Sequence, residues 1–175
     1  MKSSKKKKEI IKKTQPDKIG NVFSTPNLDT QIDQFFKKLG QPKVAVKNDK
    51  RKQLIQAAEK QLGVQYVYGG NSPKNGFDCS GFTQYIFAQK GISINRTTRS
   101  QAKAGKKIVT EKANVGDLVF FSQDGKKISH VGIVTSKPSK TLTMIHASSS
   151  KGVIHTNIMK SSYWRKRLMF VRRVV

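Results

Sequence analysis

The chain has 175 residues and a formal net charge of +25, from 35 Lys and Arg against 10 Asp and Glu. Its single cysteine excludes an intrachain disulfide framework and a metal site built from cysteines alone. No apolar run approaches transmembrane length, and the basic start MKSSKKKKEIIKKTQ lacks the apolar segment of a secretory signal peptide. The charge favours polyanionic partners: nucleic acid, an anionic lipid surface or an anionic wall polymer.

The N-terminal part differs in composition from the rest of the chain. Residues 1–27 are rich in lysine and then polar, which is typical of a disordered tail. The apolar spacing in LDTQIDQFFKKLG predicts a short amphipathic helix near residues 28–39, and QPKVAVKN follows as a linker. We therefore assign residues 1–50 to a basic, partly disordered segment that would bind a polyanionic wall or surface.

The main domain, residues 51–175, is predicted to begin with helices and to end with strands. NDKRKQLIQAAEKQLG predicts a helix capped by Asn48 or Asp49 and stopped by Gly63. A second helix is predicted over Cys79–Lys90, and a short one in TTRSQAKAG. Strands are predicted in DLVFFSQ, HVGIVTS, TLTMIHAS, GVIHTNI and LMFVRRVV. This order indicates an α+β fold with an antiparallel sheet of about five strands.

The cysteine occupies a helix start in the stretch GFDCSGF. Asp78 is predicted as the N-cap and Cys79 as the first helical residue. Unpaired backbone N–H groups and the helix dipole make this end electropositive, which favours the nucleophilic thiolate. The same N–H groups can stabilise an oxyanion formed in acyl transfer. The alternative is that the cysteine packs as a small buried apolar residue.

Two of the three histidines lie in strands joined by a turn, ISHVGIVTSKPSKTLTMIHAS. A turn centred on Pro138 would place His130 and His146 directly opposite each other on one face. One imidazole could then orient the other as the base that activates Cys79. Two alternatives stay open. A histidine in a strand can simply satisfy local hydrogen bonds, and Cys79 with all three histidines, including His155, could bind zinc, although their spacing matches no compact ligand motif.

Four motifs occur in order: YVYGGNSPKNGFDCSGF, VGDLVFFS, SHVGIV and MIHAS. Together they resemble the NlpC-type family of bacterial cell-wall cysteine endopeptidases, and the resemblance covers roughly residues 52–175. It implies a compact papain-like fold in which the helix that carries the cysteine packs on the sheet. It also implies hydrolysis of peptidoglycan stem peptides, commonly between D-γ-glutamate and a diamino acid, with no metal and no organic cofactor.

The resemblance also assigns roles to individual residues. It implies that Cys79 is the nucleophile, His130 the general base and His146 the polar residue that orients His130. Tyr66 matches a tyrosine whose hydroxyl supports the oxyanion site. The positions implied in substrate binding are Asp78, Ser80 and Ser129.

Three positions depart from the family pattern. Tyr68 stands where tryptophan is commoner, and Asn95 and Val115 replace prolines. None of the three changes removes a chemical group of the predicted site.

Other functions and locations stay open as alternatives. One is a non-catalytic basic protein that binds wall polyanion or nucleic acid, although no nucleic-acid fold signature is visible and we expect no specific nucleic-acid partner. Another is a thiol amidase or acyltransferase that uses the same residues. We expect a monomer. Its location is extracytoplasmic, in the periplasm or cell wall, if the chain is a trimmed form, whereas a cytoplasmic location or non-classical export is the alternative without a visible signal peptide.

Overall fold

The computed structural model describes residues 43–136 and 141–175, with their side chains from residue 49 onward. Every described element lies in one compact unit, Pro42–Val175. The tail and the amphipathic helix predicted near residues 28–39 lie outside the described residues, and the domain division at residue 50 stays a prediction. None of the described helices combines the length and the apolar composition needed to cross a bilayer.

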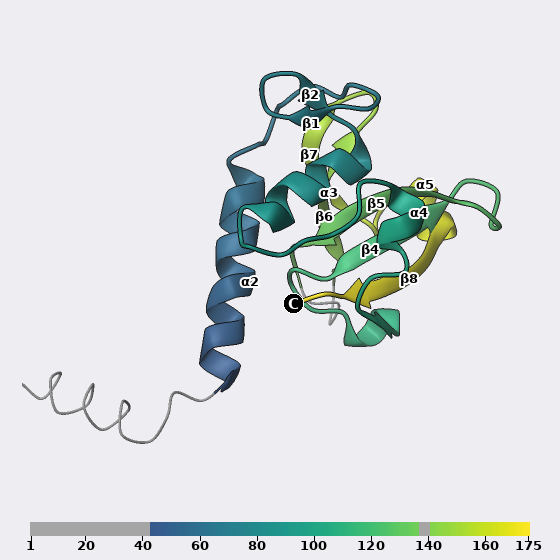
Figure 1. Cartoon of the computed structure of the whole chain (residues 1–175). Helices are drawn as coiled ribbons and strands as arrows, with labels where there is room; N and C mark the ends of the chain where they lie inside the picture. Colours follow the sequence, from purple (N-terminus) through teal and green to yellow (C-terminus); the bar gives the residue numbers. More distant parts are fainter. Residues whose placement is uncertain (1–42, 137–140) are drawn as a thin grey trace, which may run out of the picture. The chain divides into compact units, whose positions relative to one another are not determined.

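The centre of the domain is a six-stranded antiparallel sheet with the strand order β3-β8-β4-β5-β6-β7 (Figure 1). The strands are β3 (Lys106–Ile108), β4 (Leu118–Ser122), β5 (Ile128–Val134), β6 (Thr143–Ser148), β7 (Gly152–Asn157) and β8 (Leu168–Arg173). The α+β class is confirmed, and the five predicted strands are all present. The additional strand is β3, which pairs with β8 at the edge of the sheet. Its sequence, KKI, is too short and too polar to show a strand pattern.

Five helical segments and a small hairpin complete the domain. They are α2 (Lys43–Glu59), α3 (Cys79–Ala88), α4 (Thr98–Gln101), the 3-10 helix η1 (Thr110–Lys112) and α5 (Ser162–Arg167), with β1 (Asn71–Ser72) paired to β2 (Gly76–Phe77). The predicted cap at Asn48 or Asp49 is wrong, because α2 begins at Lys43 and includes much of the predicted linker. A proline at residue 42 is tolerated at a helix start, and no glycine or proline interrupts the sequence that follows. The predicted stop is confirmed, since Gly63 has a φ of +83° just beyond the helix.

Both faces of the sheet are covered, which explains the continuous apolar runs in its strands. On one face, α2 and α3 bury Leu54 and Phe82 against Phe120 and other strand residues. On the opposite face, Trp164 of α5 packs against a second apolar cluster that includes Phe121. The helix that begins with the cysteine is therefore fixed against the sheet by an apolar cluster.

The pairing of β5 with β6 differs from the predicted register. Ile133 pairs with Ile145, so the strands are shifted by two residues from the pairing that would place His130 directly opposite His146. The predicted turn centre, Pro138, lies outside the described residues. A shift by an even number of residues keeps every side chain on its own face of the sheet. The two histidines consequently remain on one face, as diagonal rather than direct neighbours.

Candidate active site

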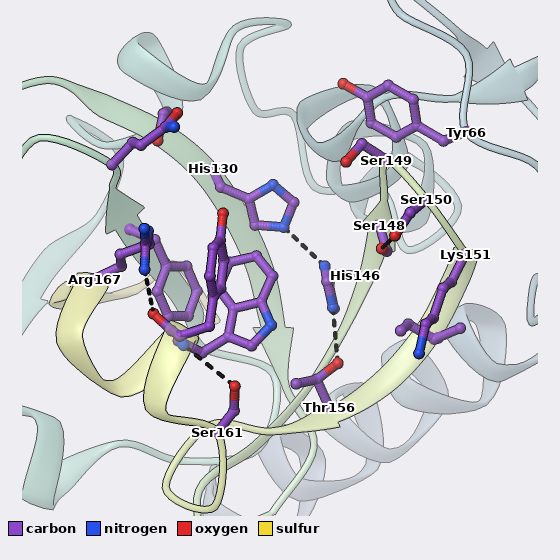
Figure 2. Close-up of a pocket in the computed structure, with 16 residues that line it drawn as sticks. Tyr66, His130, His146, Ser148, Ser149, Ser150, Lys151, Thr156, Ser161 and Arg167 are labelled. Carbon is purple, nitrogen blue, oxygen red and sulfur yellow. Dashed lines mark hydrogen bonds between the residues drawn. The ribbon is translucent and has the colours of Figure 1, made fainter.

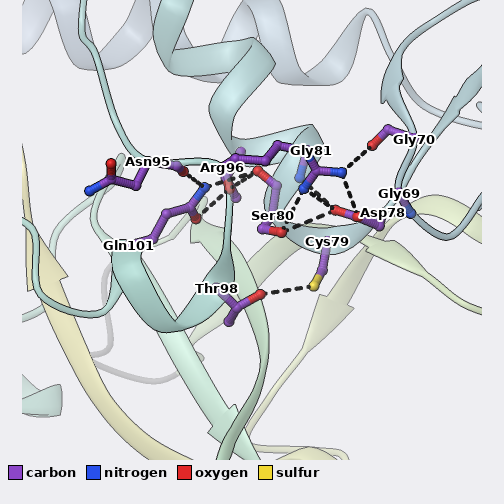
Figure 3. A network of polar contacts seen from close by, with 11 residues as sticks. Gly69, Gly70, Asp78, Cys79, Ser80, Gly81, Asn95, Arg96, Thr98 and Gln101 are labelled. Carbon is purple, nitrogen blue, oxygen red and sulfur yellow. Dashed lines mark hydrogen bonds and ion pairs between the residues drawn. The ribbon is translucent and has the colours of Figure 1, made fainter.

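The start of α3 has the geometry that the sequence predicts. Asp78 is the N-cap, and its Oδ1 accepts a hydrogen bond of 2.7 Å from the backbone N–H of Gly81. Cys79 is the first residue of the helix. Its Sγ lies 3.4 Å from the Thr98 hydroxyl at the start of α4 (Figure 3). The helix start thus presents the sulfur toward α4 and the sheet.

The protonation of Cys79 differs from the prediction, which expected the helix start to favour the thiolate. Only 7% of the residue is exposed, and this burial raises the pKa of the thiol. Hydrogen bonds from Thr98 and from the backbone of Val131 oppose the effect without reversing it. The resting side chain is therefore a neutral thiol, which needs a base before it can attack. Val131 is the neighbour of His130 in β5, so the sulfur lies against the strand that carries the predicted base.

The two predicted histidines do meet, and a third side chain joins them (Figure 2). His130 Nε2 lies 2.8 Å from His146 Nδ1, and His146 Nε2 lies 3.0 Å from the hydroxyl of Thr156 in β7. Burial lowers the pKa of His130 to about 4. Burial, together with repulsion from a charged His130, lowers the pKa of His146 to about 3. Both imidazoles are therefore neutral near pH 7, the state that a general base requires.

One arrangement of protons makes this chain of hydrogen bonds useful for catalysis. If His146 Nε2–H donates to the Thr156 hydroxyl, His146 Nδ1 accepts from His130 Nε2–H. His130 Nδ1 then carries a lone pair that can take a proton. The reverse arrangement would place the proton on His130 Nδ1 and leave no base there. A hydroxyl that accepts at Thr156 therefore selects the competent tautomer.

Small and aromatic residues shape the space around the imidazole pair. A Cβ added at Gly132 would lie 2.8 Å from Met144 Sδ and 3.2 Å from His146 Cβ, so a larger residue would crowd the diagonal contact. The Trp164 ring lies with its centroid 4.9 Å from each of the two imidazoles. An imidazolium formed during a reaction would face this aromatic ring, a favourable contact.

The thiol and the imidazole line two adjoining pockets. The pocket of about 700 Å³ contains Cys79, and the pocket of about 530 Å³ contains His130 and His146. Tyr66 and Ser129 line both pockets, so they mark the border between them. The described hydrogen bonds join Cys79 to Thr98 and not to His130, and such contacts commonly tighten only when substrate binds.

The remaining predicted residues fall into two groups. Burial, followed by the nearby charges of Cys79 and Asp78, raises the pKa of Tyr66, which keeps its hydroxyl a donor at neutral pH. Ser129 is exposed at the border of the pockets. Ser80, in contrast, is buried and donates to Asp78 Oδ1 over 3.1 Å. Their assignment to substrate binding stays a prediction.

A residue that the sequence analysis missed, Arg96, dominates the surroundings of Asp78 (Figure 3). Its Nη2 lies 2.6 Å from Asp78 Oδ2 and its Nη1 lies 2.9 Å from Asp78 Oδ1. Burial alone would raise the pKa of Asp78, but hydrogen bonds from Arg96 and Gly81 lower it overall. Asp78 is therefore an ionised carboxylate in a bidentate ion pair with Arg96.

The zinc alternative has no support among the described residues. His155 lies in β7 with its Nε2 3.9 Å from Glu59 Oε1, while the other two histidines contact each other. Within residues 43–136 and 141–175, no group of three His, Cys, Asp or Glu side chains is arranged to hold a metal ion.

Comparisons with known proteins add an independent line of evidence. A profile described as the NlpC/P60 family matches residues 63–173. The gamma-DL-glutamyl hydrolase of Bacillus subtilis (strain 168) is 38% identical over 124 residues, which are 69% of this chain and 29% of that protein. The murein DD-endopeptidase MepS/murein LD-carboxypeptidase of Escherichia coli (strain K12) is 40% identical over 114 residues, 65% of this chain and 57% of that protein. The chain thus corresponds to only part of either relative.

A solved structure resembles the fold described above. An NlpC/P60 family protein from Bacillus cereus ATCC 10987 superimposes with a TM-score of 0.64 at 31% identity, over 71% of this chain and 40% of that one.

Proposed function

The chain belongs to the NlpC/P60 family, and from this premise we propose that it is a cysteine endopeptidase that hydrolyses peptidoglycan stem peptides. The observation that carries the proposal is the 2.8 Å contact between His130 Nε2 and His146 Nδ1. His130 belongs to β5, the strand against which the Cys79 thiol lies. A nucleophile, a base and a group that orients the base are the components of thiol-dependent acyl transfer.

The reaction follows from the protonation states of these groups. His130 Nδ1 takes the Cys79 proton, and the thiolate attacks the scissile carbonyl carbon. The tetrahedral oxyanion accepts hydrogen bonds from N–H groups at the start of α3 and from the Tyr66 hydroxyl. The C–N bond breaks as the imidazolium of His130 protonates the leaving amine. A water molecule, deprotonated by His130, then hydrolyses the thioester and restores the thiol.

The bond that we propose as the target joins D-γ-glutamate to a diamino acid. The name of the Bacillus subtilis relative, a gamma-DL-glutamyl hydrolase, supports this choice. The Escherichia coli relative is named for DD-endopeptidase and LD-carboxypeptidase activities, so the cleaved bond must be identified from the products.

The test is digestion of purified peptidoglycan, with mass analysis of the released fragments. We expect the wild-type chain to release fragments that begin with the diamino acid, and Cys79→Ala and His130→Ala to release none. His155→Ala is the matched control, since His155 contacts Glu59 and lies outside both pockets. Fragments cut at another bond would redirect the assignment, and full activity of Cys79→Ala would end it.

We further infer an extracytoplasmic site of action, because the Escherichia coli relative is named for murein, a wall material. The basic residues of segment 1–50 would hold the protein on anionic wall polymers, with an attraction that weakens as salt rises. A form that begins at Pro42 should keep its turnover of soluble stem peptides and lose affinity for walls at low salt. Unchanged wall affinity in that form would contradict the role of the segment.

A further inference from the structure

The outer edge of the sheet places cations directly opposite each other. β3 pairs with β8 in an antiparallel register, in which Lys107 faces Arg172 and Lys106 faces Arg173. A Cβ added at Gly105, just before β3, would clash with the Arg173 carbonyl. The two strands therefore approach closely at this point, and the opposed cations are a fixed feature of the fold.

Lys107 and Arg172 form an unfavourable pair in the free protein. Like charges that lie directly opposite each other destabilise an antiparallel pair of strands. The neighbouring Arg173 escapes this effect, because its Nη2 lies 2.8 Å from Asp117 Oδ2. Lys107 and Arg172, in contrast, form no ion pair within residues 43–136 and 141–175.

The guanidinium of Arg172 is also poorly satisfied in its hydrogen bonds. The residue is half-buried, and its Nε is buried with no hydrogen-bond partner among the described residues. Its Nη1 donates to the Gly105 carbonyl over 3.4 Å, which is long for such a bond. A cation held partly out of water without a close acceptor is unfavourable, and an anion beside it would relieve that penalty.

The two cations share one aromatic ring. Lys107 Nζ lies 5.0 Å and Arg172 Cζ lies 5.8 Å from the centroid of the Phe170 ring. Their charged groups therefore lie beside one another, where the oxygens of one phosphate could accept hydrogen bonds from both. Phe120 also stacks on this ring, with a centroid distance of 5.4 Å and an interplanar angle of 28°. The ring thus leaves no free face on which a nucleic-acid base could stack.

The pair lies outside the proposed active site. Neither Lys107 nor Arg172 lines the pocket of Cys79 or that of His130. In the strand order, β8 and β4 separate β3 from β5, the strand that carries His130 (Figure 1). An anion could therefore bind at this edge while a substrate occupies the site.

We propose that Lys107 and Arg172 bind a phosphodiester of an anionic wall polymer, a poly(glycerol phosphate) chain. The inference rests on the proposed function for the location at the wall. It gives the folded domain a polymer contact of its own, which adds to that of segment 1–50. The exposed Lys103 and Lys106 lie next to the pair in the chain and would attract neighbouring phosphates. The covered ring favours a polymer without bases over nucleic acid.

The experiment measures binding of poly(glycerol phosphate) to the full chain by calorimetry, from about 50 mM to about 200 mM salt. Lys107→Glu should weaken binding about tenfold, because a charge-assisted contact is lost. It should also lower the slope of log K against log salt by about one. Arg172→Gln should weaken binding in the same direction. Segment 1–50 is intact in every variant, so its contribution cancels.

Lys160→Glu is the matched control. It makes the same change of charge at an exposed residue that follows β7, at the opposite edge of the sheet. Its affinity for the polymer should change by less than about twofold. Equal losses in Lys107→Glu and Lys160→Glu would mean that the overall charge binds the polymer, and would overturn the proposal.

Thermal melts test the repulsion that the proposal invokes. Lys107→Glu places opposite charges across the strand pair, so the melting temperature should rise by about 2 °C while polymer binding falls. A charge on an edge strand also prevents pairing with other chains, and glutamate keeps that protection. Unchanged polymer affinity in Lys107→Glu would reduce Lys107 to this protective role and overturn the proposal.

Two further measurements separate the partner and the function. Tighter binding of a single-stranded oligonucleotide, lost in Lys107→Glu, would assign the surface to nucleic acid and overturn the proposal. Lys107→Glu should keep wild-type turnover of soluble stem peptides. If wild type hydrolyses no peptidoglycan while polymer binding depends on Lys107, the proposed function fails and the surface stands. If hydrolysis occurs and polymer binding ignores Lys107, the surface fails and the function stands.

Discussion

Replacing Thr156 with valine would remove one hydroxyl and keep the shape of the side chain. That hydroxyl lies 3.0 Å from Nε2 of His146, which is fully buried. In the competent tautomer Nε2–H would lose its acceptor, and a buried unsatisfied donor costs about 1–3 kcal/mol. His146 can avoid the cost only by moving its proton to Nδ1, which forces His130 Nδ1 to carry a proton. The penalty therefore falls on the active state and should lower kcat by about 5- to 150-fold.

The assay measures kcat and KM for one stem-peptide substrate from pH 5 to pH 9. KM should change less than kcat, because Thr156 lines the pocket of the two histidines and not the pocket of the thiol. Thr156→Ser keeps the acceptor and should recover most of the lost rate, while thermal melts monitor folding of both variants. Activity of Thr156→Val within twofold of wild type would refute the tautomer argument. Equal losses in the serine and valine variants would attribute the effect to packing instead.

Three further predictions follow from other contacts. Gly132→Ala should cost roughly 1–3 kcal/mol of stability through overpacking and reduce kcat by displacing His146; unchanged thermal melts would contradict the crowding. Asp117→Asn should lower the free energy of unfolding by about 3–5 kcal/mol in urea titrations, because the fully buried carboxylate pairs with two arginines; a loss below 1 kcal/mol would mean that the pairs are dispensable. Folding lowers the pKa of His130 to about 4 and that of His146 to about 3, so the unfolded chain protonates at a higher pH than the folded protein, and stability should fall as the pH drops from about 6.5 to about 3. In a His130→Gln variant this pH dependence should weaken. An unchanged pH dependence would exclude His130 as its source.

The features that the sequence predicted correctly depend on local chemistry. Asp78 and Cys79 start a helix because a short polar side chain can cap the N–H groups of the residues that follow. His130 and His146 lie on the same face of the sheet because side chains alternate along a strand, so a shift of the pairing by an even number of residues leaves each side chain on its face. The register error of two residues therefore left their contact intact.

The features that the sequence analysis missed depend on contacts between distant segments. Arg96 reaches Asp78 from a loop 18 residues away, and nothing in its local sequence indicates that partner. Trp164 covers the histidines from α5, a short helix whose place on the sheet is set by tertiary packing. Thr156 could have been predicted from the alternation of side chains along β7. Ile154 pairs with His146, and Thr156 lies on the same face of the strand as Ile154. His155, the histidine of the same strand, lies on the opposite face of β7.

Burial favours the neutral forms of the Cys79 thiol and of both imidazoles in the resting site. A thiolate stabilised in advance would have to be kept in a site that is only 7% exposed, where an isolated charge is costly. A neutral thiol beside a neutral imidazole avoids that cost while the site is empty. In the proposed reaction, charge appears only after the proton moves to His130, when Trp164 would face the new imidazolium and the start of α3 would face the anion. In the proposed reaction the start of α3 therefore acts on the charge that develops, whereas burial keeps the pKa of the resting thiol raised.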